Sequence, residues 1–388
     1  MKMDTKQIIN QEKKYIVHTY ARPDIVIDHG KGCYVFDKAG KKYIDLVGGI
    51  ATCPLGHGNK QFAESINKQI AKITNPTNLY YTEEQVILAE KLAKLSGLDK
   101  CFFSNSGTES VEAAIKLTRK HAKKYEIIAT KNSFHGRTFG SLAATGKEKI
   151  KQQFKPMLEG FRHIEYGNVK ALEKAITNKT AAFIVEPIQG EAGIIMPSQD
   201  YLKQVREICN KHEILLIIDE VQTGYGRTGK FFAYQHSKIK PDIVTLAKGL
   251  ANGIPIGVTI TNNNVANSFK PGDHGSTFGG NPVSCKAANF TIEHIISKKL
   301  MQKASMMGDY LIKKISSLNI SSIKEVRGKG LMIAIEFNKQ VKNILKKCLD
   351  NGLIVNSTSE KVIRLLPPLT INKKIIDDSI KILEKALK

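Results

Sequence analysis

An apolar segment at residues 214–218 constrains the fold of this chain more than any other feature, because all of its side chains are isoleucine or leucine. A strand with two apolar faces is buried on both sides, which is typical of a parallel sheet covered by helices. Helical stretches such as residues 82–95, where Thr82 and Gln85 have capping-box spacing, alternate with further apolar segments. These segments lie at residues 101–103, 126–129, 181–185 and 243–245. The alternation predicts an α/β fold with a mostly parallel sheet.

The two ends of the chain show different patterns. Residues 34–46 alternate apolar and polar side chains around a turn, which predicts a β-hairpin. The last hundred or so residues read as two helices, a strand at 331–337, a helix, a strand at 362–365 and a final helix, a smaller α+β unit. We therefore expect three parts: an N-terminal segment over residues 1–55, a large domain over 56–282 and a small C-terminal domain over 283–388.

The chain is strongly basic, with 59 lysines and arginines against 36 acidic residues and a formal net charge of +23. Such a surplus can attract a polyanion, but the abundance of lysine, isoleucine and asparagine also fits a compositional bias. Only eight of the basic residues are arginine, whereas nucleic-acid recognition favours arginine and stacked aromatic side chains. We expect no nucleic-acid partner, and an acidic protein remains the alternative to compositional bias.

Cysteine spacing and the N-terminal residues indicate where the protein works. The six cysteines show no Cys-x-x-Cys spacing, so neither a zinc cluster nor a disulfide framework is expected. The first 15 residues are polar and lysine-rich, and no stretch approaches about 18 uninterrupted apolar residues. We expect no metal, no membrane insertion and a reducing cytoplasm.

Two polar residues follow buried strands. Asp219 comes directly after residues 214–218, and Lys248 comes shortly after the strand that begins at residue 243. Strand ends of this kind meet at the edge where ligands bind in open α/β sheets. Taken singly, Asp219 could be a helix cap and Lys248 a solvated surface residue. Together they are what pyridoxal phosphate requires, a lysine that forms the Schiff base and a carboxylate that keeps the pyridine nitrogen protonated.

A third element, Ser104-Asn-Ser-Gly-Thr-Glu109, connects the strand at 101–103 to a helix that runs to about residue 124. Backbone amides at a helix start, together with the helix dipole and two hydroxyls, suit a phosphate group. Gly107 permits close approach of the backbone. The same spacing also caps helices, so this segment alone leaves both interpretations open.

The segment Gly224-Tyr-Gly-Arg-Thr-Gly229 matches the G-x-G-x-x-G pattern of dinucleotide binding. In dinucleotide-binding folds this pattern lies directly between a strand and a helix. Here the glycines begin five residues past Asp219, and no sustained helical face precedes Pro241. A nicotinamide-dependent dehydrogenase is therefore a remote alternative, and a nucleic-acid-binding module is the non-enzymatic one.

Together these residues resemble the class III aminotransferases, in particular the acetylornithine aminotransferase group, over residues 15–383. Seven collinear segments carry the resemblance: Asn78-Leu-Tyr-Tyr81, Phe103-Ser-Asn-Ser-Gly-Thr-Glu109, Phe134-His-Gly-Arg-Thr138, Asp219-Glu-Val-Gln222, Lys248-Gly249, Gly275-Ser-Thr-Phe-Gly-Gly-Asn-Pro282 and Arg364-Leu-Leu-Pro-Pro-Leu369. The resemblance implies the fold type I architecture of pyridoxal-phosphate enzymes. It also implies a homodimer whose active sites lie at the dimer interface.

The resemblance assigns cofactor-binding roles to particular residues. It makes Lys248 the Schiff-base lysine and proton shuttle, and Asp219 the partner of the pyridine nitrogen. It makes Gly107 and Thr108 ligands of the cofactor phosphate, which Thr277 of the other subunit would also reach.

Further residues would surround the cofactor ring. The resemblance places Phe134 on one face of the ring and Val221 on the other, and brings Gln222 to the ring oxygen. Glu220, between Asp219 and Val221, belongs to the same cofactor-binding segment.

The resemblance also implies substrate-binding residues. Arg137 would hold a substrate carboxylate, Ser276 would touch the substrate, and Arg364 would receive the α-carboxylate of glutamate or 2-oxoglutarate, because arginine binds carboxylates bidentately. Glu191 resembles a switch glutamate that neutralises the second arginine when the substrate has no carboxylate there. Tyr20 matches a tyrosine that contacts a carboxylate.

The nature of the amino donor depends on residues 47–51. Related ornithine aminotransferases carry a tyrosine in this segment, where it helps to fix a free α-amino group, whereas this chain has Ile50. An apolar residue would leave a free ammonium unpaired, which is costly to desolvate. We therefore expect an α-N-acylated ornithine or lysine as donor, in arginine or lysine biosynthesis. The acyl group can be acetyl or, in an alternative favoured by the basic charge, an acidic amino-group carrier protein.

Overall fold

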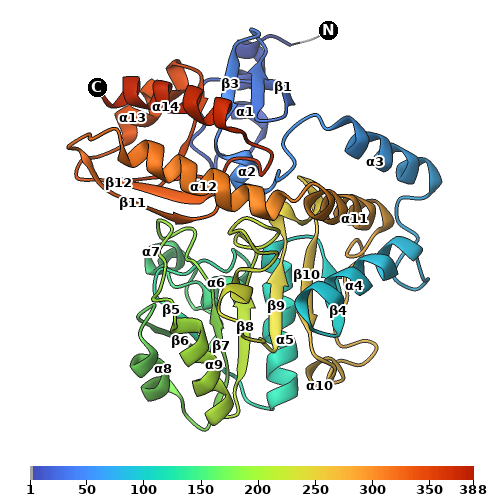
Figure 1. The fold of residues 1–388 in the computed structure, drawn as a ribbon. Coiled ribbons are helices and arrows are strands. Elements are labelled where there is room, and N and C mark those ends of the chain that lie inside the picture. The colour runs from blue at the N-terminus through green and yellow to red at the C-terminus, as the bar shows by residue number, and fades with distance from the viewer. Residues whose placement is uncertain (1–2) are drawn as a thin grey trace.

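The computed structural model describes residues 3–388, which form three sheets and the helices around them (Figure 1). The largest sheet has the strand order β4 (Lys100–Ser104), β10 (Gly257–Thr261), β9 (Ile243–Leu246), β8 (Leu215–Asp219), β7 (Thr180–Val185), β5 (Glu126–Thr130) and β6 (Phe161–Ile164). Strand β10 runs antiparallel to β4 and β9, and the other neighbouring pairs are parallel. The predicted mostly parallel α/β sheet is confirmed. Strands β6 and β10 are not among the predicted strands, because their glycine, threonine, arginine and histidine residues weaken the apolar pattern.

Helices cover both faces of this sheet. Leu216 and Ile218 of β8 belong to the same core cluster as the buried residues of α9 (Tyr201–Lys211). Ile217 points the opposite way and belongs to the cluster that contains residues of α5 (Gly107–Ala122). Successive side chains of a strand point to opposite faces, so the uninterrupted apolar run is explained by burial on both.

Two four-stranded sheets lie in the upper half of Figure 1. The first has the order β1 (Ile27–Lys31), β2 (Tyr34–Asp37), β3 (Lys42–Asp45) and β13 (Leu353–Ile354). The second has the order β11 (Ile323–Lys329), β12 (Met332–Phe337), β15 (Val362–Leu365) and β14 (Asn356–Ser359). The expected hairpin is confirmed as β2 and β3, which pair antiparallel. Because β13 pairs with β3, the N-terminal region and the C-terminal region share one sheet.

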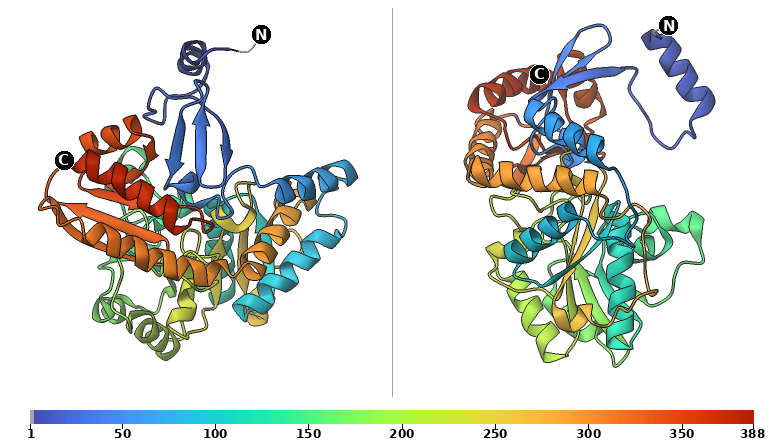
Figure 2. Two further views of the ribbon diagram at one scale, coloured as in Figure 1. Left: turned by 45° about the horizontal axis from the view of Figure 1, so that its top comes forward. Right: turned by 90° about the vertical axis from the view of Figure 1, so that its right-hand side faces the viewer.

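The remaining α-helices of the described chain are α1 (Thr5–Tyr15), α2 (Gly48–Ala51), α3 (Lys60–Lys72), α4 (Glu83–Ser96), α6 (Phe139–Ala144), α7 (Glu148–Lys151), α8 (Val169–Ala175), α10 (Asn263–Ala266), α11 (Pro282–Ser297), α12 (Leu300–Ser316), α13 (Lys342–Asp350) and α14 (Lys373–Leu387). Short 3-10 helices lie at Gln152–Phe154, Ala233–His236 and Lys248–Ala251. Helix α1 stands apart from the rest of the protomer (Figure 2), and none of its residues is buried. Within residues 3–388, no helix combines the length and apolar character needed to cross a membrane.

One local expectation is wrong. Helix α4 begins after Thr82, but the Thr82 side chain makes no capping hydrogen bond. Gln85 instead donates from Nε2 to Oδ1 of Asn78 at 2.9 Å and to the carbonyl oxygen of Gly280 at 3.3 Å. Asn78, seven residues away, and Gly280, far along the chain, thus replace the capping box as partners of Gln85.

The glycine segment at residues 224–229 is part of a loop, as its sequence context predicts. The next element along the chain is the short 3-10 helix Ala233–His236, and no α-helix follows before β9 within the described residues. Inside this loop Arg227 is buried and donates to the carbonyl oxygens of Leu331 (3.0 Å) and Pro367 (2.5 Å). The loop therefore anchors the C-terminal region to the large sheet and does not form a dinucleotide-binding turn.

Candidate active site

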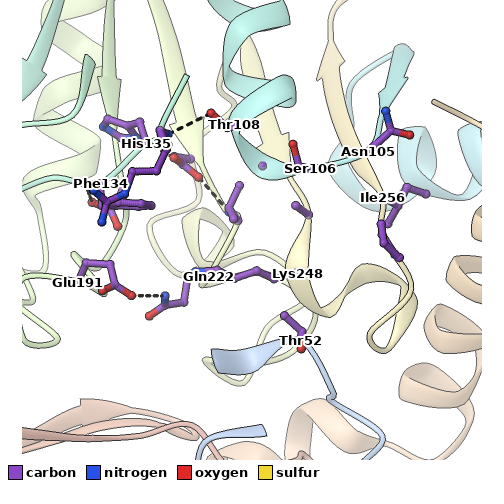
Figure 3. A pocket seen from close by; sticks show the side chains of 18 of the residues that line it. Thr52, Asn105, Ser106, Thr108, Phe134, His135, Glu191, Gln222, Lys248 and Ile256 are labelled. Carbon is purple, nitrogen blue, oxygen red and sulfur yellow. Dashed lines mark hydrogen bonds and ion pairs between the residues drawn. The ribbon is translucent and has the colours of Figure 1, made fainter. Parts of the chain in front are cut away.

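A cavity of about 440 Å³ opens at the carboxyl ends of the parallel strands (Figure 3). Nine residues singled out from the sequence line it: Gly107, Thr108, Phe134, Arg137, Glu191, Asp219, Val221, Gln222 and Lys248. They come from the ends of β4, β5, β7, β8 and β9, and the parallel order of these strands is what brings their ends to one edge.

Lys248 follows β9, and its backbone lies in the left-handed region with a φ of 38°. A residue with a Cβ pays a conformational cost there, which the surrounding structure must offset. Its side chain enters the cavity (Figure 3), and its Nζ has no hydrogen-bond or ion-pair partner within residues 3–388. Burial lowers the pKa of Lys248; the carboxylates of Glu191 and Asp219 oppose this shift and the Arg364 charge adds to it. A lysine with a lowered pKa is suited to nucleophilic attack and proton transfer.

Asp219, the last residue of β8, is paired with a histidine that the sequence had not singled out. Oδ2 of Asp219 lies 2.7 Å from Nδ1 of His135, and both side chains are buried. The other ring nitrogen of His135, Nε2, is buried without a hydrogen-bond partner among residues 3–388. Burial lowers the pKa of His135, but the hydrogen bond and charge of Asp219, with the charge of Glu186, outweigh it and raise the pKa. Asp219 therefore has a buried, titratable hydrogen-bond partner whose ring also lines the cavity.

Glu186 is a second buried carboxyl group at the cavity wall, and sequence reasoning missed it. It directly follows β7, just as Asp219 ends β8, so the same strand-end signal could have found it. Its Oε2 accepts from the backbone N–H of Phe134 at 3.1 Å, and its Oε1 from that of Gly190 at 3.3 Å. Burial raises the pKa of Glu186 to about 7, although the His135 charge opposes the shift. Glu186 thus ties the Phe134 segment to the loop that carries Glu191.

The start of α5 lines the cavity with backbone N–H groups, and its cap is built by neighbouring side chains. Oγ of Ser106 accepts from the backbone N–H of Glu109 at 3.3 Å, and the Glu109 carboxylate accepts from the backbone N–H of Asn105 at 2.8 Å. A Cβ added at Gly107 would lie 2.9 Å from Cγ1 of Val221, so only glycine fits without a shift. The segment therefore caps the helix, as one of the two interpretations predicts, and the helix start also faces the cavity, where its backbone N–H groups would suit an anion.

A hydroxyl cluster and an arginine adjoin this helix start. Oγ1 of Thr108 lies 2.9 Å from Oγ1 of Thr138 and 2.5 Å from Oγ of Ser141. The same oxygen accepts from the backbone N–H of Arg137 at 3.2 Å. The guanidinium of Arg137 lies over the ring of Phe134, 5.5 Å from its centroid. The segment after β5 therefore brings hydroxyls, an aromatic face and a cation to one side of the cavity.

Arg364 and Glu191 form an ion pair beside the cavity. Nη1 of Arg364 donates to Oε1 of Glu191 at 2.5 Å and to Oε1 of Gln222 at 3.2 Å, and Arg364 is only 2% exposed. Burial opposes ionisation of Glu191, but the charges of Arg364 and Lys248 outweigh it and lower its pKa to about 2. Glu191 is therefore a carboxylate at any physiological pH.

Apart from Arg364, which lies beside the cavity, four of the singled-out residues do not line it within one protomer. Glu220 is buried with its carboxylate turned away, accepting from Oγ1 of Thr223 (2.5 Å) and the backbone N–H of Tyr234 (2.9 Å). Ser276 lines a separate depression, Thr277 is exposed, and Tyr20 is 68% exposed. Whatever Ser276, Thr277 and Tyr20 bind must therefore come to the outer surface of the protomer.

Comparison with known proteins agrees with this geometry. Residues 15–387 match the family described as aminotransferase class-III. The chain belongs to the class III aminotransferases. An acetylornithine aminotransferase of Methanothermobacter thermautotrophicus is 45% identical over 383 residues, which cover 98% of each chain. One of Archaeoglobus fulgidus is 45% identical over 375 residues, covering 97% of this chain and 99% of that protein.

Solved structures of aminotransferases share the fold. The ornithine aminotransferase of Toxoplasma gondii aligns with a TM-score of 0.96 at 31% identity, over 100% of this chain and 95% of that chain. The acetylornithine aminotransferase of Elizabethkingia anophelis aligns with a TM-score of 0.89 at 34% identity, over 100% and 99% of the two chains. A second Toxoplasma gondii structure contains pyridoxal phosphate at partial occupancy in the active site. The aminotransferase described here is likewise an enzyme of the pyridoxal-phosphate-dependent class.

Proposed function

We propose that this aminotransferase moves the terminal amino group of an α-N-acylated ornithine to 2-oxoglutarate, giving a semialdehyde and glutamate, in arginine biosynthesis. Its relatives at 45% identity over nearly the whole chain are named acetylornithine aminotransferases, which favours acetylornithine as donor. An acylated lysine is the second candidate, because it carries the same terminal amine on a chain one carbon longer. We also propose residues 1–55, 56–282 and 283–388 as the N-terminal segment, the large domain and the small domain.

The cavity fits pyridoxal phosphate by the chemistry of its walls. The start of α5, which opens on the cavity beside Gly107 and Thr108, suits the phosphate, and Phe134 and Val221 offer apolar faces to a ring. Asp219 offers a carboxylate, and Gln222 an amide. When bound, this cofactor supplies an electron sink for the negative charge that develops on the substrate carbon. The buried carboxylate of Glu220 would hold the end of this segment in place through its hydrogen bonds from Thr223 and Tyr234.

The protein's own groups would then carry the transfer. Nζ of Lys248 would take a proton from the donor carbon that bears the amine and, in the second half-reaction, would give a proton to the α-carbon of 2-oxoglutarate as it becomes glutamate, a task that its lowered pKa favours. Asp219, hydrogen-bonded to His135, would partner the pyridine nitrogen of the cofactor. Arg137 and Arg364 orient substrate carboxylates.

The contact between Arg364 and Glu191 is the observation that carries this proposal. A donor that enters with its terminal amine brings no carboxylate to Arg364, and the Glu191 carboxylate neutralises the arginine meanwhile. 2-Oxoglutarate brings its α-carboxylate to the same place and needs Arg364 free. Because the Glu191 side chain can give up its place on Arg364 to a substrate carboxylate, one cavity can accept both the amino donor and 2-oxoglutarate.

The region around Ile50 favours an acylated donor. Ile50 lies in the turn of α2, two residues before Thr52, which lines the cavity. Its 41% exposed side chain offers no acceptor to an ammonium group. A free α-amino group would lose its water without gaining a partner, and an acylated nitrogen avoids that cost.

Substrate comparison tests the proposal. We expect the purified holoenzyme to form glutamate from 2-oxoglutarate and N-acetylornithine with a kcat/KM at least roughly 10-fold above that for free ornithine, a difference of about 1.4 kcal/mol. N-acetyllysine and 4-aminobutyrate complete the donor set. A preference for free ornithine or 4-aminobutyrate would contradict the acylated-donor assignment.

We further propose a homodimer with shared active sites. The segments around Asn78 and Ser276 are joined by a hydrogen bond from Nδ2 of Asn78 to the Ser276 carbonyl oxygen at 2.9 Å. They expose a group of large apolar side chains, namely Leu79, Tyr80, Tyr81 and Phe278. An apolar patch of this kind marks an interface. Thr277 lies within it, and a second protomer there would receive Thr277 near its own cavity.

The net charge of +23 leaves room for a carrier-linked donor. A small acidic amino-group carrier protein that holds the donor's α-nitrogen would be attracted by such a surface. This partner is the alternative to the acetyl group. We place the enzyme in the cytoplasm, where its six unpaired cysteines would stay reduced.

A further inference from the structure

Lys147 is a cation beside the Arg364–Glu191 pair that the proposed reaction does not use. Its Nζ donates to the backbone carbonyl oxygen of Glu191 at 2.7 Å, across 44 residues of sequence. The side chain is half-buried, and within residues 3–388 it forms no ion pair with a carboxylate. Glu191 is therefore held by two cations, by Arg364 through its carboxylate and by Lys147 through its main chain.

The charged groups that act on Lys147 are residues of the proposed substrate site. Burial lowers the pKa of Lys147, the carboxylates of Glu191 and Glu186 oppose the shift, and the charges of Arg364 and Arg137 add to it. The charge of Lys147 in turn helps to lower the pKa of Glu191. Since both arginines act on Lys147, it lies within electrostatic reach of both expected carboxylate sites.

We propose that Lys147 is a positioning residue that receives the Glu191 carboxylate when a substrate carboxylate takes its place on Arg364. This inference rests on the proposed function, in which Arg364 binds the α-carboxylate of 2-oxoglutarate. A Glu191 carboxylate displaced from Arg364 would lose its ion-pair partner at a site where its side chain is only 27% exposed, and a partly buried charge is costly without a partner. Because Lys147 already anchors the Glu191 main chain, a side-chain rotation exchanges one cation for another without moving the loop.

Binding of glutarate, a five-carbon dicarboxylate without a reactive carbonyl, tests this role in the holoenzyme. Calorimetry should show that Lys147→Met and Lys147→Gln each raise the Kd for glutarate roughly 3- to 10-fold, because both remove the charge. Lys147→Arg should restore binding to near the wild-type value. Lys149→Met, which removes an exposed lysine two residues along the chain, is the matched control and should bind glutarate like the wild type.

The Glu191→Gln background isolates the proposed interaction. With no carboxylate to relocate, adding Lys147→Met should leave the glutarate Kd of Glu191→Gln unchanged. The KM for 2-oxoglutarate in the Lys147 single variants should rise more than the KM for the amino donor. Circular dichroism should confirm that each variant is folded.

Three results would overturn the inference. The first is an unchanged Kd for glutarate in folded Lys147→Met. The second is a wild-type Kd in Lys147→Gln, which would reduce the role of Lys147 to its main-chain hydrogen bond. The third is a rise in Kd on adding Lys147→Met to Glu191→Gln that equals the rise in the wild-type background. A wild-type enzyme that transfers no amino group to 2-oxoglutarate would instead refute the proposed function. Wild-type turnover therefore separates the two failures.

Discussion

Nδ1 of His135 lies 2.7 Å from Oδ2 of Asp219, and both side chains are buried at the carboxyl edge of the large sheet. The contact joins residues 84 positions apart in the sequence. The Asp219 carboxylate thus has a titratable partner, and that partner also lines the cavity.

This pair predicts a pH-dependent contribution to stability. The pKa of His135 is raised above its ordinary value of 6.5 in the folded state, so the pair stabilises the fold fully below pH 6.5. That stabilisation is lost as the pH rises through the folded-state pKa. We expect His135→Gln to lower the free energy of unfolding by about 1 to 3 kcal/mol at low pH, and by less at alkaline pH.

Urea denaturation between pH 5.5 and 9 would measure the difference at each pH. His29→Gln is the matched control, because His29 lies 3.0 Å from Asp28 in an exposed pair. Its effect should stay below about 0.5 kcal/mol at every pH. A His135→Gln effect that does not change with pH would contradict the cationic pair.

Lys248→Ala should abolish amino transfer while the fold remains intact, since no other lysine lines the cavity among the described residues. We expect the turnover number to fall roughly 1,000-fold or more, because both the nucleophile and the proton carrier are lost. Borohydride treatment followed by mass spectrometry should attach the cofactor to the wild type and not to the variant. Lys240→Ala, which removes an exposed lysine, is the control and should keep wild-type turnover.

Asp219→Asn should retain part of the cofactor and lose most of the rate. The amide is nearly the same size as the carboxylate but cannot supply its negative charge, so we expect kcat to fall by about 100-fold or more. Absorbance of the bound cofactor and steady-state kinetics measure the two effects separately. Asp200→Asn changes an exposed aspartate whose side chain caps nothing and should leave both unchanged. A near-normal rate in Asp219→Asn would remove Asp219 from the reaction.

Thr277→Ala should weaken cofactor binding even though Thr277 lies outside the cavity of its own protomer. Mixing Thr277→Ala and Lys248→Ala subunits should produce hybrid dimers in which one of the two sites has both residues intact. Activity in the mixture should therefore recover in part, up to about a quarter of the wild-type value if subunits exchange at random. Mixtures that exchange subunits and stay inactive would speak against a shared site.

Salt dependence separates the two readings of the basic charge. If the charge serves an acidic carrier, raising the ionic strength should increase the KM for a carrier-linked donor about 10-fold or more, and far less for free N-acetylornithine. Compositional bias predicts equal and weak effects on both donors. Initial rates between 20 mM and 300 mM salt, roughly a 20 to 6 Å range of screening length, would measure them. Equal responses would remove the support that the charge lends to a carrier.

Much of the site could be predicted from the sequence because its residues follow directly on the strands that position them. Asp219 ends β8, Lys248 comes two residues after β9, and Gly107 begins α5 shortly after β4. Apolar runs predict buried parallel strands, and such strands deliver their final residues to a common edge. The α/β class and the cofactor chemistry therefore follow from local pattern and spacing.

Other features depended on contacts between distant segments, which no local pattern specifies. His135 hydrogen-bonds to Asp219, and Lys147 hydrogen-bonds to Glu191, because the folded chain brings together residues that lie many positions apart. Gln85 hydrogen-bonds to Asn78, and this contact replaces the helix cap that its spacing predicts. The sequence by itself determined which residues reach the edge of the sheet, since hydrophobic periodicity decides strand and helix. Only the tertiary structure decided which charges pair there, because pairing depends on distance and burial in three dimensions.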